Sequence, residues 1–131
     1  MRIVIDSNVW ISALIFGGKP RHIFERVVTD GLTIIVSEEI FTEVRRVLTL
    51  KFPDFIDDFE NFQAVMQPYT TKVRLGHLKV TVSRDEDDNR IIETALTGNV
   101  SHIITGDKDL LVLSKYKKIN MITPADFLGI V

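Results

Sequence analysis

The chain has 131 residues, of which 45% are hydrophobic and 26% are charged, as in an ordinary globular protein. This length predicts one domain over residues 1–131, and no apolar run approaches the roughly 20 residues that span a bilayer. The lack of cysteine excludes disulfides and thiolate metal sites, and the formal charge of −2 excludes a chain that is basic throughout. We therefore expect a cytoplasmic protein that does not bind membranes.

Strand and helix patterns alternate along the first half of the chain. The β-branched run over residues 2–5 predicts a buried strand, and residues 7–16 predict a helix that ends at two glycines. The next predicted elements are a helix over residues 21–29, a strand over residues 32–36, a helix from an N-cap at Ser37 to Leu50, and a helix from Pro53 to about Met66.

The alternation resumes after a weakly patterned stretch. One short strand is expected near residues 72–74, and Asp85 can cap a helix that runs to about Thr97. The last predicted elements are a strand over residues 102–105, a short helix over 108–114, a strand over 119–122 and a helical turn over 124–128. Strands that alternate with helices imply right-handed crossovers and a mainly parallel sheet, in which sites form beyond the carboxyl ends of the strands.

Two aspartates stand at such strand ends. Asp6 directly follows the first strand, where it can cap the next helix, bind a ligand or do both, because a carboxylate has several acceptor positions. Asp107 follows the strand over residues 102–105 after Gly106, which permits a tight turn. Asp107 is therefore the stronger ligand candidate of its segment, and Asp109 is a candidate for an outer ligand.

Glu43 is the third candidate acid, and it lies in the middle of a predicted helix. It stands three residues after Ile40 and four before Val47, which places it at the edge of the apolar stripe of that helix. A solvated ion pair with Arg46 is the alternative explanation for a glutamate at this position. An inward carboxylate is costly unless a cation or a hydrogen-bond donor meets it. Glu43 is therefore a strong ligand candidate only in combination with the other acids.

Periodicity also separates the members of the acidic run Arg84–Asn89. Asp88 lies three, four and seven residues before apolar positions of the same helix, so it continues the buried face. Acids are favoured at a helix N-terminus, and we interpret Asp85 as the cap and Glu86 and Asp87 as mostly solvated. Asp88 is then the inward ligand of the run.

Five carboxylates are thus expected to gather at one edge of the sheet: Asp6, Glu43, Asp88, Asp107 and Asp109. Such a cluster repels itself, and hard oxygen ligands favour Mg²⁺ or Mn²⁺ as the cation that joins it. A basic rim around an acidic centre would suit a phosphate backbone. Candidate pairs for this rim are Arg21 with Arg26, Arg45 with Arg46, Lys72 with Arg74, and Lys115 with Lys117 and Lys118.

These motifs resemble the PIN domain family along essentially the whole chain. The matching segments, in order, are Val4–Val9 with Ser12 and Ala13, then Glu43, then Arg84–Asn89 with Thr94 and Ala95, then Ile103–Leu111. The chain is most similar to prokaryotic single-domain proteins related to the VapC toxins of toxin–antitoxin pairs. Ser7 stands where the family often has threonine, and Glu86 where this branch commonly has proline; neither difference removes an acid.

The resemblance implies a three-layer α/β/α fold with strand order 3-2-1-4-5. It also implies Mg²⁺- or Mn²⁺-dependent cleavage of RNA, with Asp6, Glu43, Asp88 and Asp107 as catalytic metal ligands and Asp109 as a further one. An antitoxin partner and a homodimer follow from the same resemblance, and the apolar stripe Phe55, Phe59, Phe62 and Met66 could serve such an interface or the core. The alternative is a non-catalytic PIN-like module that only binds RNA or a partner.

Overall fold

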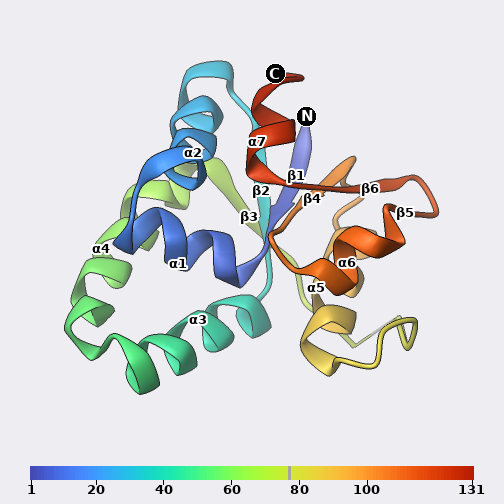
Figure 1. Ribbon diagram of the computed structural model, residues 1–131, viewed down its shortest axis with the longest axis horizontal. Helices are drawn as coiled ribbons and strands as arrows, with labels where there is room; N and C mark the ends of the chain where they lie inside the picture. Colours follow the sequence, from blue (N-terminus) through green and yellow to red (C-terminus); the bar gives the residue numbers. More distant parts are fainter. Residues whose placement is uncertain (77) are drawn as a thin grey trace.

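The structure is a computed structural model and describes residues 1–76 and 78–131. Its centre is a sheet with the strand order β3-β2-β1-β4-β6-β5 (Figure 1). The strands are β1 (Arg2–Ile5), β2 (Thr33–Val36), β3 (Thr70–Lys72), β4 (His102–Ile104), β5 (Lys115–Tyr116) and β6 (Ile119–Ile122). The strand pairs are parallel except β5 with β6, which confirms the predicted α/β class with a mainly parallel sheet.

The predicted strand order 3-2-1-4-5 is confirmed when the last predicted strand is identified with β6. Strand β5 was not predicted, because two residues are too short to show a period. Ser114 and Lys117, which flank β5, take left-handed φ values of 61° and 54°, and they turn the chain into a hairpin with β6. The same turn ends the preceding helix at Leu113, whereas the sequence predicted that this helix would reach Ser114.

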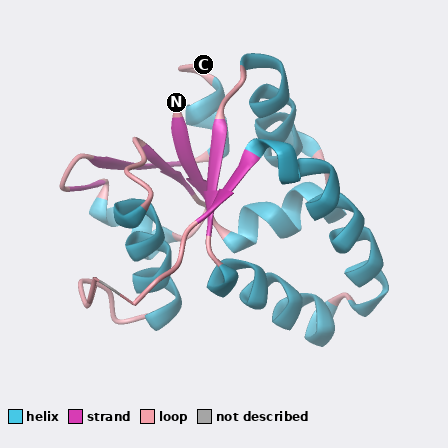
Figure 2. Ribbon diagram, turned by 180° about the vertical axis from the view of Figure 1, so that it is seen from behind, coloured by secondary structure: helices cyan, strands magenta, loops and turns pink. Residues whose placement is uncertain are grey.

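Helices lie on both sides of the sheet. Figure 1 shows α1, α2 and α4 to one side of the strands and α5 and α6 to the other, and Figure 2 shows the same division from behind. Their bounds are α1 (Ser7–Ile15), α2 (Gly18–Asp30), α3 (Glu38–Lys51), α4 (Ile56–Met66), α5 (Glu86–Thr97), α6 (Lys108–Leu113) and α7 (Pro124–Leu128), with 3-10 turns over Pro53–Phe55 and Gln67–Tyr69. No helix in the described part of the chain has both the length and the apolar character that a bilayer crossing needs.

Three local predictions differ from the structure. Helix α2 begins at Gly18 rather than at residue 21, because a proline at position 20 is tolerated in a first turn, where its missing N–H has no helical partner. Strand β3 begins two residues earlier than expected, where it pairs with β2. Ser37 occupies the N-cap of α3 without capping it, because its buried hydroxyl lies 2.9 Å from the Thr94 hydroxyl of α5 instead.

An aromatic cluster fills the core between α1, α2, α3 and α4. The fully buried Trp10 ring lies 4.6 Å from Phe24 and 6.4 Å from Phe59 between centroids, and Phe41 and Phe62 complete the cluster in tilted or edge-on contacts. Phe59 and Met66 are buried and Phe55 and Phe62 pack against the core. The apolar stripe of α4 is therefore mainly core, and its apolar pattern no longer argues for a dimer interface.

Candidate metal centre

Asp6 lies at the carboxyl end of β1, where it is 4% exposed. Its Oδ1 accepts hydrogen bonds from the backbone N–H of Ser7 at 2.7 Å and from the Ser7 hydroxyl at 3.3 Å, so Asp6 caps α1. Its Oδ2 accepts a hydrogen bond from the Thr105 hydroxyl at 2.7 Å. The carboxylate is therefore fixed from both sides, and each oxygen still has acceptor capacity for a ligand.

Thr105 joins the ends of β1 and β4. Its fully buried hydroxyl donates to Asp6 and accepts a hydrogen bond from the backbone N–H of Asp107 at 2.9 Å. One side chain thus orients two of the predicted site acids. The sequence shows Thr105 only as a polar residue at the end of an apolar strand, a signal that predicts no role by itself.

Asp88 lies in the first turn of α5 and faces inward, with 4% of its surface exposed. Asp85 caps this helix as predicted, because its carboxylate accepts a hydrogen bond from the backbone N–H of Asp87 at 2.9 Å. The side-chain amide of the next residue, Asn89, accepts a hydrogen bond from the backbone N–H of Ser83 and donates one to its carbonyl oxygen, both at 2.9 Å. These bonds hold the preceding loop against the helix. The N-terminal turn that carries Asp88 is therefore well fixed.

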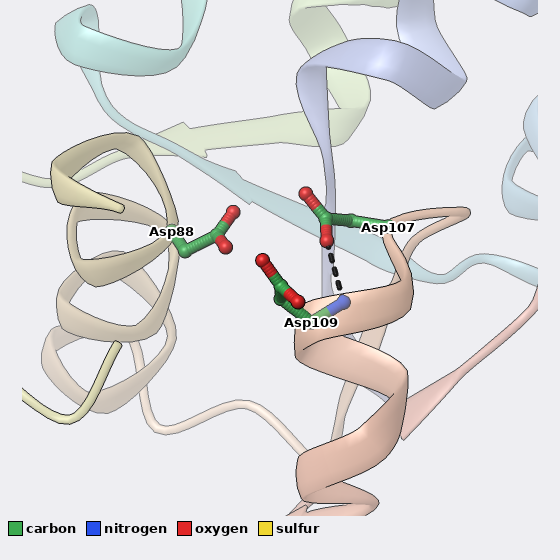
Figure 3. A group of neighbouring side chains, drawn as sticks. All are labelled: Asp88, Asp107 and Asp109. Atoms are coloured by element: carbon green, nitrogen blue, oxygen red, sulfur yellow. Dashed lines mark hydrogen bonds between the residues drawn. The ribbon is translucent and has the colours of Figure 1, made fainter. Parts of the chain in front are cut away.

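Asp88, Asp107 and Asp109 converge on one point (Figure 3). One carboxylate oxygen from each lies within 4.8 Å of those of the other two. Asp107 also caps α6, since its Oδ1 accepts a hydrogen bond from the backbone N–H of Asp109 at 2.8 Å. Asp109, expected as an outer ligand, thus belongs to the same group of converging oxygens.

Glu43 lies apart from these three acids, in the middle of α3. Its half-buried carboxylate is 3.9 Å from the Arg46 guanidinium, the i, i+3 pair that its spacing allowed. Burial raises the pKa of Glu43 to about 7; the Asp87 and Asp6 carboxylates add to this, and the Ser7 hydroxyl and Arg46 oppose it. Glu43 is therefore linked to the other acids electrostatically, through Asp6.

The buried acids Asp6 and Asp88 have raised pKa values for the same reason. Burial raises the pKa of Asp6, against the hydrogen bonds from Thr105 and Ser7, and Asp107 raises it further. The pKa of Asp88 is raised to about 7, mainly by burial; the Asp107, Asp85 and Asp6 carboxylates raise it as well. The buried acids of the cluster thus hold their protons well above the usual range of a carboxyl group.

This donor set fits a hard divalent cation. The converging atoms are carboxylate oxygens, which Mg²⁺ and Mn²⁺ prefer. Burial, and after it the neighbouring carboxylates, disfavour the charged forms of Glu43 and Asp88, and a bound cation would favour those charged forms again. Asp88, Asp107 and Asp109 could hold such an ion directly, with Asp6 beside them through its bond to Thr105.

Comparison with known proteins decides the family. The PIN domain family model matches residues 2–109. The chain belongs to the PIN domain family. PIN domains are generally nucleases that use divalent metal ions, and the acidic cluster described above is the feature of this chain that such chemistry requires.

One protein is similar to the chain in sequence, and one solved structure is similar to it in fold. It is 32% identical over 140 residues to the uncharacterized protein MJ1680 of Methanocaldococcus jannaschii, an alignment that covers 98% of this chain and 90% of that protein. Its fold is similar to that of a chain of VapBC2 from Rickettsia felis, solved bound to a DNA fragment from their promoter, with a TM-score of 0.65 and 10% identity. That similarity covers 94% of this chain and 98% of the other.

Proposed function

We propose that this PIN domain is a metal-dependent endoribonuclease, with Asp6, Glu43, Asp88 and Asp107 as catalytic acids and Asp109 as a further metal ligand. The observation that carries the proposal is the convergence of Asp88, Asp107 and Asp109 within 4.8 Å beside the buried Asp6. Asp88 is buried, Asp107 is partly exposed and Asp109 is exposed; bringing their like charges together, one of them out of water, costs free energy that a bound cation would offset. Membership in a family whose members are generally nucleases supports a role of this cluster in phosphodiester cleavage.

The chain's own residues hold and orient the acids. A bound Mg²⁺ or Mn²⁺ would supply Lewis-acid stabilisation of the phosphodiester and activation of the attacking water. Ser7 and Thr105 fix the Asp6 carboxylate, so that its free acceptor positions keep one direction. Asp107 is fixed in turn by Thr105 and by the first turn of α6. A site held from several elements at once loses little entropy when it binds its substrate.

Cleavage of single-stranded RNA tests the proposal. Purified protein should cut a labelled oligonucleotide in Mg²⁺ or Mn²⁺ and stop when EDTA is added. Asp6→Asn and Asp88→Asn should each lower the rate by about two to three orders of magnitude, the usual effect of losing a major electrostatic contribution. Asp30→Asn is the matched control, because Asp30 is a surface acid paired with Arg26 and should keep the wild-type rate.

Two outcomes would reject this assignment. Full activity in EDTA would indicate a contaminant or another mechanism. Near wild-type rates from both Asp6→Asn and Asp88→Asn would remove the catalytic role of these acids. Tight RNA binding without any cleavage would favour the second candidate, a PIN-like module that binds RNA or a partner without turnover.

We further propose that the protein acts in the cytoplasm as the toxin of a toxin–antitoxin pair. The fold similarity to a chain of VapBC2 supports this. A hollow of about 400 Å³ between α1, α2 and α4, lined by apolar side chains such as Leu14 and Phe24, could receive an apolar segment of the antitoxin. A small adjacent reading frame whose product copurifies with this chain and stops cleavage would support the pair; a complex that cleaves at the full rate would reject it.

A homodimer is the remaining proposal on partners, and it rests on the family alone now that the α4 stripe is found in the core. Light scattering that gives twice the chain mass of 14.9 kDa would support it. A monomer mass at working concentration would reject it.

A further inference from the structure

Two neighbouring arginines of α3, Arg45 and Arg46, have opposite surroundings. Arg45 is satisfied within the fold: its guanidinium bonds Glu60 at 2.9 Å, Glu38 at 3.2 Å and Gln63 at 3.2 Å. It also lies 5.8 Å from the centre of the Phe59 ring. These contacts join α3 to α4, so Arg45 is a structural residue.

Arg46 instead lies beside Glu43 and Asp87, and its side chain is 56% exposed. Its Nη2 donates to Asp87 of α5 at 3.2 Å and lies 3.9 Å from Glu43. Among the described residues both of these contacts use Nη2, which leaves Nε and Nη1 for other acceptors. Arg46 is therefore a cation with spare donors, one helical turn from a proposed catalytic acid.

A hollow of about 410 Å³ opens at this point, and its lining includes the guanidinium groups of Arg46 and Arg90 and four carboxylates, those of Glu38, Glu39, Glu43 and Asp87. It brings together a proposed metal ligand and two guanidinium groups in the seam between α3 and α5. Arg90 is less available than Arg46, because it lies near Glu93 at 3.5 Å and Glu86 at 3.8 Å.

We propose that Arg46 binds a backbone phosphate of single-stranded RNA next to the phosphodiester that is cut, which makes the α3–α5 seam part of the substrate path. This inference rests on the proposed ribonuclease function. A guanidinium presents a planar fork of donors that matches two phosphate oxygens, and such a contact is stronger than the single bond to an exposed carboxylate. Phosphate would then replace Asp87 as the partner of Arg46.

The alternative is that Arg46 only ties α3 to α5. Exposed ion pairs contribute little to stability, so this alternative predicts a small effect that is the same whichever partner is removed. Asp87→Asn and Arg46→Gln would then act alike. The phosphate role predicts opposite effects, because Asp87→Asn frees Arg46 for RNA, whereas Arg46→Gln removes the fork.

The experiment measures kcat and KM for cleavage of a single-stranded RNA oligonucleotide over a range of NaCl concentrations. Arg46→Gln should raise KM about tenfold with little change in kcat, as expected for one charge-assisted contact. It should also reduce the slope of log(kcat/KM) against log[NaCl] by about 0.7, the contribution of one phosphate contact on a single strand. Arg46→Lys should restore the slope and part of KM, because it keeps the charge and loses the fork.

Lys51→Gln is the control, since Lys51 is an exposed cation in the last turn of the same helix and does not line the hollow. It should leave KM and the salt slope unchanged, and Asp87→Asn should lower KM or leave it unchanged. Equal KM and slope in wild type and Arg46→Gln would overturn the proposal, as would a rise in KM that Asp87→Asn reproduces.

Binding keeps this test separate from the proposed function. The same oligonucleotide with a fluorescent label, titrated with Asp107→Asn protein in Mg²⁺, reports affinity without turnover. The double variant Asp107→Asn with Arg46→Gln should bind the oligonucleotide about tenfold more weakly than Asp107→Asn alone. Its salt slope should also be smaller, whether or not the wild type cleaves RNA. Unchanged binding would overturn the role of Arg46, and absent cleavage by the wild type would overturn only the function.

Discussion

Helices α1 and α3 each serve two regions of the molecule that have opposite energetics. Helix α1 begins at the Asp6 cap and carries Trp10 into the aromatic cluster. Helix α3 carries Phe41 into the same cluster and Glu43 to the acids. Burial of the aromatic side chains stabilises the fold, whereas burial of the acids raises their pKa values and destabilises it.

This difference indicates how a small domain can maintain a costly site. Elements that are anchored by large apolar side chains can hold carboxylates together that would otherwise separate. The net stability of a domain is small, about 5–15 kcal/mol, so one region must offset the other. We therefore expect mutations in the aromatic cluster to lower stability whatever the metal concentration, and mutations in the acidic cluster to change how stability depends on pH and metal.

Phe59→Ala should give the largest loss of stability. Phe59 is fully buried and contacts both Trp10 and Phe41, so its removal should lower the free energy of unfolding by about 3–5 kcal/mol. Val65→Ala is the control on the same helix; Val65 is 67% exposed, and its loss should cost less than about 0.5 kcal/mol. Urea unfolding in EDTA and in Mg²⁺ measures both. Similar losses for the two variants would contradict the assignment of the aromatic cluster as the stabilising region.

The sequence predicted most of this architecture because its signals are local. Strands β1 and β4 show as apolar β-branched runs, and the burial of Asp88 follows from its spacing to apolar positions of α5. Strand β5 was missed because a pair of residues carries no period. The early start of α2 was missed because glycine and proline, which usually interrupt helices, stand in its first turn.

The site was harder to predict where it depends on distant residues. Thr105 bonds Asp6 across 99 positions of sequence, and no periodicity encodes that contact. The position of Asp109 beside Asp88 depends on how α6 leaves β4, which the local pattern does not specify. The different roles of Arg45 and Arg46 also follow only from packing, because adjacent helical residues point in different directions.

The pH dependence of stability should distinguish the acidic region from the aromatic one. Glu43 and Asp88 have ordinary pKa values of 4.5 and 3.8 and folded-state values of about 7. As pH rises from about 4 to about 7, the unfolded chain releases these protons before the folded chain does, so the free energy of unfolding falls. In EDTA, thermal melts should therefore show a Tm that drops by several degrees over this range and then levels off.

Asp88→Asn should flatten that decline, because a neutral amide has no proton to lose and relieves the repulsion. Near pH 7.5 in EDTA this variant should be as stable as the wild type or more stable. Mg²⁺ should then raise the Tm of the wild type more than that of the variant, because a ligand that binds only the folded state stabilises it in proportion to its affinity. A wild type that does not respond to Mg²⁺, together with a destabilised Asp88→Asn, would mean that Asp88 only stabilises the N-terminal turn of α5.

The smallest expected effect concerns Asp85, which caps α5 three residues before the proposed ligand Asp88. Asp85 is an exposed cap of this helix and also one of the charges that raise the pKa of Asp88. Asp85→Ala removes both the cap and the charge, whereas Asp85→Asn keeps a capping side chain and removes only the charge. Asp85→Asn should therefore match or slightly exceed the wild type in Tm near pH 7.5, while Asp85→Ala should fall below Asp85→Asn by about 1 kcal/mol in unfolding free energy. This difference should be the same in EDTA and in Mg²⁺, because a cap contributes equally whether or not a cation is bound. If the difference grew in Mg²⁺, Asp85 would belong with Asp88 to the metal centre.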